Sequence, residues 1–165
     1  MKAAVIGAGY WGPNLIRNFL AADEVRGVVA CDIDDARLAR MQKSFYGIET
    51  EPDAASVIDR TDIDIVVIAT PVSTHFELAN RALEAGKHVW LEKPLTASVE
   101  EAERLIETAE RKGLKLFVDH TFIYTGAVRK MKELLNDGRV GDLYYFDSVR
   151  VNLGLFQHEI GRAHV

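Results

Sequence analysis

The sequence predicts a doubly wound α/β fold, in which helices cover both faces of a parallel sheet. Short apolar segments rich in valine and isoleucine alternate with amphipathic helical segments over most of the 165 residues. Residues 64–69 are mostly isoleucine and valine, which is typical of a central strand buried on both faces. The chain is 48% hydrophobic and 27% charged, the balance expected of a globular domain with a sizeable core.

The alternation predicts six strands and the helices between them. The strands are expected at residues 2–6, within 49–62, and at 27–32, 64–69, 88–92 and 114–118. Helices with an apolar stripe are expected at residues 11–22, 34–46, 74–85 and 98–113, with a short one within 49–62. Asp34 is a predicted N-cap, and residues 74–77 and 98–101 are predicted capping boxes.

The pattern changes after residue 120, where we place a domain boundary. Residues 122–136 predict one helix, and residues 143–153 predict one long strand with alternating side chains. A lone strand cannot form a stable domain, because its edges stay unpaired. We therefore expect 1–120 to be one complete domain and 121–158 to be the truncated start of a second. Residues 159–165 are interpreted as a non-native tail.

Gly7-Ala8-Gly9-Tyr10-Trp11-Gly12 is a complete G-x-G-x-x-G motif between the first strand and the first helix. In this context the motif predicts a dinucleotide-binding Rossmann fold. Gly7 permits the tight turn, Gly9 lets the backbone approach the pyrophosphate, and Gly12 lets the helix pack closely on the strand. The helix N-terminus offers free N–H groups to the phosphates. The alternative is a tight turn that binds no ligand.

Asp32 ends the second strand, 20 residues after Gly12. A carboxylate at this position accepts hydrogen bonds from the adenosine ribose and repels a 2′-phosphate. No arginine follows at once, since the next residues are Ile33, Asp34 and Asp35. We therefore expect NAD to be preferred over NADP. The alternative is a solvated turn aspartate.

Further polar residues follow strands at the carboxyl edge of the predicted sheet, where such folds bind ligands. Thr70 follows residues 64–69, and His75 begins the next helix, either as a cofactor contact or as a surface residue. Glu92 and Lys93 precede Pro94, which is expected to hold Lys93 extended into the cleft. A lysine there can donate to a substrate hydroxyl and exchange a proton. The alternative is a solvated lysine in a turn.

The composition of the chain limits its possible partners and the compartment in which it works. The net charge of −5 and a pI of about 5.5 argue against nucleic acid as a partner. Cys31 is the single cysteine, so no intramolecular disulfide forms and a reducing compartment is expected. We find no signal peptide and no apolar run long enough to cross a bilayer, which predicts a cytoplasmic protein without a membrane partner.

The glycine motif, residues 69–71 with 74–75, and residues 92–95 together resemble the Gfo/Idh/MocA family of oxidoreductases. The resemblance implies a Rossmann domain over 1–120 and an α/β domain with an open mixed sheet after it. It implies a small-molecule sugar or nucleotide-sugar substrate and a homo-oligomer at full length. Lys93 would be the catalytic, substrate-facing lysine. The residues implied to line the NAD site are Gly7, Gly9, Tyr10, Trp11, Gly12, Asp32, Ile33, Thr70, His75 and Glu92.

The resemblance departs from the family at residues 121–126, where many members carry an Asn-Arg-Arg-Phe-Asn-Pro-like stretch. The family's second-domain aspartate–histidine pair is expected beyond this chain, so the chain alone is predicted to bind NADH without turnover. Residues 122–129 and 152–156 look most like members that oxidise the C3 hydroxyl of nucleotide-linked amino sugars. The rival hypothesis is a non-catalytic NAD(H)-binding module or redox sensor, which would have no use for Lys93.

Overall fold

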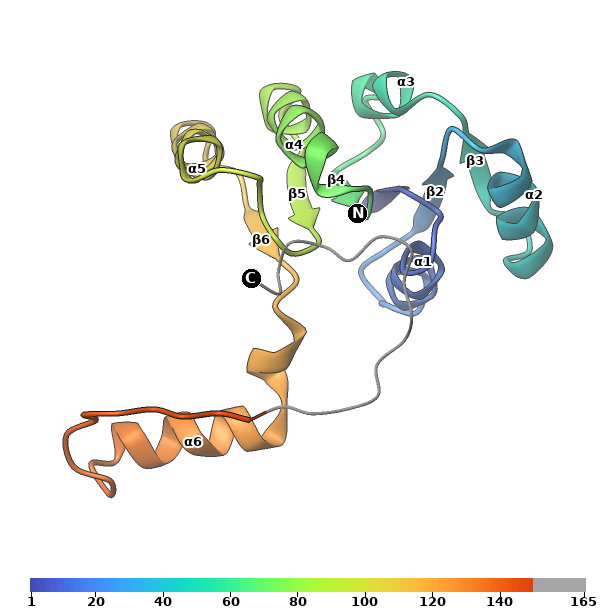
Figure 1. Ribbon diagram of the computed structural model, residues 1–165. Helices are drawn as coiled ribbons and strands as arrows, with labels where there is room; N and C mark the ends of the chain where they lie inside the picture. The colour runs from blue at the N-terminus through green and yellow to red at the C-terminus, as the bar shows by residue number, and fades with distance from the viewer. Residues whose placement is uncertain (150–165) are drawn as a thin grey trace. The chain divides into compact units, whose positions relative to one another are not determined.

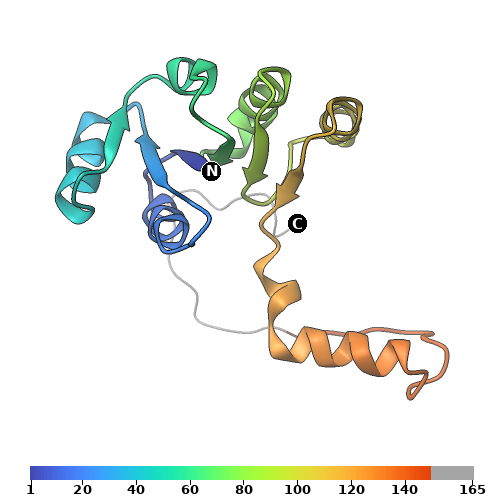
Figure 2. The same ribbon diagram turned by 180° about the vertical axis from the view of Figure 1, so that it is seen from behind.

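A computed structural model describes residues 1–149 and is shown from two sides in Figures 1 and 2. One six-stranded sheet has the order β3-β2-β1-β4-β5-β6, and every neighbouring pair is parallel. The strands are β1 (Lys2–Ile6), β2 (Gly27–Cys31), β3 (Glu49–Glu51), β4 (Ile65–Ile68), β5 (His88–Leu91) and β6 (Leu116–Val118). The winding reverses between β1 and β4, which confirms the doubly wound Rossmann fold.

Helices cover both faces of the sheet (Figures 1 and 2). They are α1 (Gly12–Leu20), α2 (Asp35–Ser44), α3 (Ala54–Asp59), α4 (His75–Glu84) and α5 (Val99–Lys112). Buried side chains of α3, α4 and α5 form one core with the sheet, and those of α1 and α2 form another on the opposite face. The sheet is therefore buried on both sides, as its Ile/Val-rich strands require.

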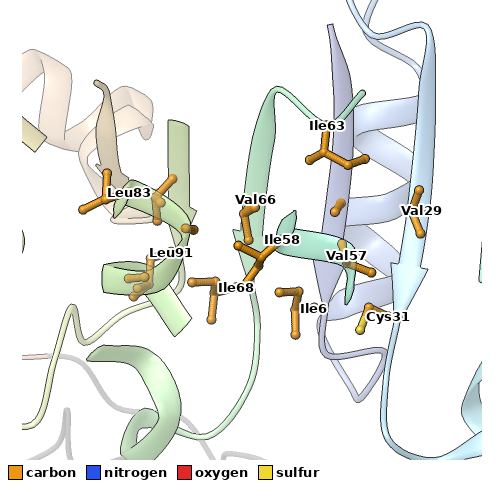
Figure 3. Close-up of a cluster of buried hydrophobic side chains, with 14 of the residues drawn as sticks. Ile6, Val29, Cys31, Val57, Ile58, Ile63, Val66, Ile68, Leu83 and Leu91 are labelled. Carbon is orange, nitrogen blue, oxygen red and sulfur yellow. The ribbon is translucent and has the colours of Figure 1, made fainter. Parts of the chain in front are cut away.

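The larger core surrounds the short helix α3. Val57 and Ile58 lie among side chains of neighbouring strands, including Ile6, Cys31 and Ile68 (Figure 3). Cys31 is fully buried, and loss of hydration raises the pKa of its thiol to about 12. It therefore behaves as a small hydrophobic residue at the end of β2.

Two of the three predicted helix caps are confirmed. The Asp34 carboxylate accepts from the Ala36 amide at 2.9 Å, and the Ser98 hydroxyl accepts from the Glu101 amide at 3.2 Å. The capping box at residues 74–77 is wrong, because the Thr74 hydroxyl donates back to the Pro71 carbonyl at 2.8 Å. Thr74 ends a 3₁₀ turn, η1 (Val72–Thr74), and α4 begins after it without a side-chain cap.

The chain divides into two compact units, Met1–Asp119 and the residues from His120 onwards. In the second unit the predicted helix 122–136 is split into η2 (Thr121–Tyr124) and α6 (Gly126–Asn136). Thr125 separates them because its backbone is extended, with ψ of 147°. Among all described residues, no helix is long and apolar enough to cross a membrane.

The predicted strand 143–153 is wrong over its described part. Residues 143–149 belong to no strand, because a strand needs hydrogen bonds from a neighbour and none is supplied within residues 1–149. The remainder of that prediction, the segment 152–156 and the predicted tail 159–165 lie outside the described residues.

Candidate functional site

The glycine turn after β1 contains two positions that admit no side chain. Gly7 has φ of +101°, and a Cβ atom there would lie 2.5 Å from the Ala69 carbonyl oxygen. A Cβ atom on Gly12 would lie 2.0 Å from the Gly7 carbonyl oxygen. These glycines let β1, β4 and α1 approach one another, as the motif predicts.

Gly9 differs, because the fold itself does not demand a glycine there. A Cβ atom on Gly9 would meet only the Arg37 side chain, at 3.9 Å. A glycine at this position is therefore not required for packing, and its missing side chain leaves open space at the start of α1. That helix has no side-chain cap at Trp11. Its second residue, Pro13, carries no N–H, and the Asn14 amide donates to the Trp11 carbonyl at 2.9 Å, so the Gly12 amide is the one within the first three helical residues that faces an anion.

Asp32 lies directly after β2 and is only 5% exposed, so the solvated-turn alternative is wrong. Its carboxylate accepts from the Ala8 amide at 2.7 Å and from the Asp34 amide at 2.9 Å. The Arg37 guanidinium donates to the same carboxylate at 3.3 Å. Asp32 thus ties the glycine turn to the start of α2, and about one of its four lone-pair positions stays available to a ligand.

A cavity of about 460 Å³ opens beside the glycine turn, lined by Gly9, Tyr10, Pro13, Arg37 and Arg40. Tyr10 is 76% exposed and Ile33, next to Asp32, is 93% exposed. Sequence reasoning missed Pro13 and both arginines. The available signal was the three-residue spacing of Arg37 and Arg40 in a helix capped by Asp34, which places them on one face.

His75 is 1% exposed, so the surface-residue alternative is wrong. Its Nδ1 atom lies 2.9 Å from the Pro94 carbonyl oxygen, and its Nε2 atom lies 2.9 Å from the Thr70 carbonyl oxygen. The ring therefore joins the loop after β4 to the loop after β5. Both ring nitrogens lie against backbone carbonyl oxygens, and whichever carries the proton donates to one of them, so His75 positions these loops.

Glu92, which is half-buried, and the buried Asp119 form a carboxyl pair at the ends of β5 and β6. The Glu92 amide donates to Ile68 at 3.0 Å and the Asp119 amide donates to Leu91 at 2.8 Å, which extends both strand pairings to this edge. Asp119 is 7% exposed, and the Glu92 Oε1 atom is buried without a hydrogen-bond partner in the described part of the chain. Burial and the hydrogen bond to Asp119 raise the pKa of Glu92 to about 7.

Lys93 follows Glu92 directly and is exposed, at the same edge of the sheet. The Lys93–Pro94 peptide is cis, whereas the sequence predicted only an extended lysine. Asp119 was missed because one aspartate after a short strand looks like an ordinary turn residue. Its burial beside Glu92 depends on the pairing of β5 with β6.

The site therefore collects its polar groups from the carboxyl ends of β1, β2, β4, β5 and β6, the ligand-binding edge of such a sheet. Among residues 1–149, no three histidine, cysteine or acidic side chains lie close enough to bind a metal. The turn, the anion-accepting helix start and the buried Asp32 fit a dinucleotide. Fold and site together define a dinucleotide-binding Rossmann domain.

Residues 1–120 match the Gfo/Idh/MocA family, described as an oxidoreductase family with an NAD-binding Rossmann fold. The chain belongs to this family, and its cofactor is NAD. The family relationship was thus correctly identified from the glycine motif, residues 69–71 with 74–75, and residues 92–95.

Three relatives show the range of the family. The chain is 38% identical over 124 residues to a dTDP-3,4-didehydro-2,6-dideoxy-α-D-glucose 3-reductase of Streptomyces antibioticus, covering 75% of this chain and 38% of that one. It is 34% identical over 142 residues to inositol 2-dehydrogenase 3 of Saccharopolyspora erythraea, covering 86% and 42%. The WlbA dehydrogenase of Chromobacterium violaceum, solved with NADH and UDP-GlcNAcA, superposes with a TM-score of 0.79 at 26% identity, covering 86% and 41%. The chain thus spans about two fifths of each relative.

Proposed function

We propose that the protein containing this chain transfers hydride between NAD and a hydroxyl-bearing carbon of a sugar. The observation that carries this proposal is Lys93, next to the Glu92–Asp119 carboxyl pair at the same sheet edge as the glycine turn. NAD supplies the hydride acceptor or donor when bound. A residue that exchanges a proton with the substrate hydroxyl completes such a reaction, and lysine can do this.

The residues proposed to line the cofactor extend from the glycine turn to Glu92. Gly9 and the start of α1 would hold the pyrophosphate, and Asp32 would accept a ribose hydroxyl through its remaining lone pair. Tyr10, Trp11 and Ile33 offer exposed apolar surface beside that position. The others proposed are Gly7, Gly12, Thr70 and Glu92. His75 is buried, so it is proposed to act indirectly, by holding the loop that carries Thr70.

Lys93 is proposed as the catalytic residue because it can donate to the substrate oxygen and exchange its proton. The adjacent Glu92 carboxyl keeps its proton up to a higher pH than a carboxyl group in water does, since its pKa is raised to about 7. Lys93 itself is exposed in this chain. In the full protein we expect a second domain to cover it and exclude water.

The proposal is tested with Lys93→Met in the full-length parent protein. General acid–base groups contribute on the order of 10²–10⁴ in rate, so turnover should fall by that factor while the NADH dissociation constant stays within about threefold. Lys115→Met is the matched control, because Lys115 is an exposed lysine at the opposite end of β6. Turnover within a few-fold of wild type would show that Lys93 is only a turn residue. The non-catalytic NAD(H)-binding module would instead be favoured if the wild-type parent bound NADH but turned over no sugar substrate.

The substrate is proposed to be a nucleotide-linked amino sugar. One relative is named for a dTDP-sugar and another was solved with UDP-GlcNAcA, whereas a third is named for inositol. A panel of nucleotide sugars, free sugars and inositols, assayed with NAD and the full-length parent, decides between them. Turnover of a free polyol with none of the nucleotide sugars would contradict the proposal.

A further inference from the structure

Two carboxyl groups lie together where β5 and β6 end, at the ligand-binding edge of the sheet. Asp119 is buried and shares a hydrogen bond with the Glu92 carboxyl group. The Glu92 Oε1 atom is also buried, and no donor within residues 1–149 reaches it. A carboxyl group that keeps its proton has one O–H donor, so a proton held by the pair satisfies two acceptors that would otherwise face each other.

The charge of this pair changes near neutral pH. Burial and Asp119 disfavour the ionised form of Glu92, whereas Lys93, next in the chain, favours it. The pKa of Glu92 is therefore raised to about 7, and the pair gains one negative charge as pH rises through this value. The titratable group that α4 contributes here is His75, whose ring lies 2.9 Å from the Pro94 carbonyl oxygen.

NAD⁺ and NADH differ by one charge, which lies on the nicotinamide ring. Their pyrophosphate and adenosine groups are the same, so contacts with the glycine turn and Asp32 affect both alike. In the proposed cofactor site Glu92 lies towards the nicotinamide end, because β5 is separated from the glycine turn by β4. A cation close to a carboxyl group favours its ionised form, whereas an uncharged ring does not.

We propose that Asp119 is a positioning residue that acts through Glu92 and makes the protein distinguish NAD⁺ from NADH according to pH. The inference rests on the proposed cofactor site and gives a role in it to a residue outside the proposed cofactor contacts. Below neutral pH the pair keeps its proton and contributes little to the choice between the two oxidation states. Above neutral pH the ionised pair attracts the cationic ring, so NAD⁺ gains affinity and NADH does not.

The test is isothermal titration calorimetry of the 165-residue chain with NAD⁺ and with NADH at pH 6 and pH 8.5. A nearby opposite charge lowers the pKa of a carboxyl group by about 1–3. With a decrease from about 7 to about 6, the dissociation constant of NAD⁺ relative to that of NADH should fall about fivefold between these pH values. At pH 7, NAD⁺ binding should release about 0.4 proton, measured in two buffers of different ionisation enthalpy, and NADH binding none.

Two variants remove the titrating pair. Asp119→Asn should abolish both effects, because the pKa of Glu92 then returns towards that of an ordinary carboxyl group. Glu92→Gln should abolish them as well, since no titrating carboxyl group is left at that position. Glu107→Gln is the matched control at an exposed glutamate of α5 and should keep the wild-type pH dependence. His120→Asn should keep it too, and it removes the imidazole that follows Asp119, because histidine commonly titrates near neutral pH.

The same pH dependence for NAD⁺ and NADH in the wild-type chain would overturn this role of the pair. A preference for NAD⁺ that still rises with pH in Asp119→Asn, or one that disappears in His120→Asn, would overturn it too. An equal loss of both dinucleotides in Asp119→Asn, with the wild-type pH dependence retained, would show that Asp119 is merely structural. A chain that binds neither dinucleotide would refute the proposed cofactor site itself.

Discussion

The Glu92–Asp119 pair makes the stability of this domain depend on pH in a predictable direction. The pKa of Glu92 is raised from 4.5 to about 7 in the folded chain. Between these values the folded state holds a proton that the unfolded state has released, so the free energy of unfolding falls as pH rises from about 4.5 to 7. Asp119→Asn removes the like charge and supplies an amide donor, which should bring the pKa of Glu92 down.

The magnitude follows from the size of this shift. The difference of 7 − 4.5, about 2.5 pH units, corresponds to at most about 3.5 kcal/mol at about 1.4 kcal/mol per unit. Glu92 is only partly buried, so we expect water to reduce the loss to about 1–2 kcal/mol. Asp119→Asn should remove at least half of it.

Urea denaturation of the 165-residue chain at pH 5 and pH 8, followed by circular dichroism, measures the effect. Glu103→Gln is the control, because Glu103 is an exposed glutamate within α5. Its pH dependence should match wild type. Our reasoning about the pair is refuted when Asp119→Asn loses as much stability between pH 5 and pH 8 as wild type does.

Three further predictions concern the framework of the site. Gly12→Ala should destabilise the domain by more than about 3 kcal/mol or prevent folding, because its Cβ would lie 2.0 Å from the Gly7 oxygen; a normal thermal melt would contradict this. Ser98→Ala should lower the free energy of unfolding, measured by urea denaturation, by about 1 kcal/mol, because it removes the α5 cap. An unchanged midpoint would show that the helix start is stable without the Ser98 hydroxyl. Lys87→Met should cost about 1–3 kcal/mol, because its buried ammonium donates to two backbone carbonyls; an equally stable variant would mean that water replaces it.

Local pattern was sufficient for the sheet and for half of the site. Strands such as residues 64–69 are buried on both faces, so nearly all of their side chains must be apolar. Such an apolar run can be recognised directly in the amino-acid sequence. The glycine motif is local in sequence, because its three glycines fall within six residues, although Gly7 meets Ala69, directly after β4, only in the folded sheet. Asp32 was found because its spacing from Gly12 follows from the length of one helix and one strand.

Tertiary structure decided the features that depend on neighbouring elements. Asp119 becomes a partner of Glu92 only when β6 pairs with β5, and Arg37 reaches Asp32 only when α2 turns back over the glycine loop. The Thr74 hydroxyl donates to the Pro71 carbonyl and does not cap the amide groups of α4, because Thr74 belongs to the turn η1 that precedes this helix. Residues 143–149 alternate like a strand, yet alternation describes side chains alone. A strand also needs backbone partners, and these come from another segment of chain.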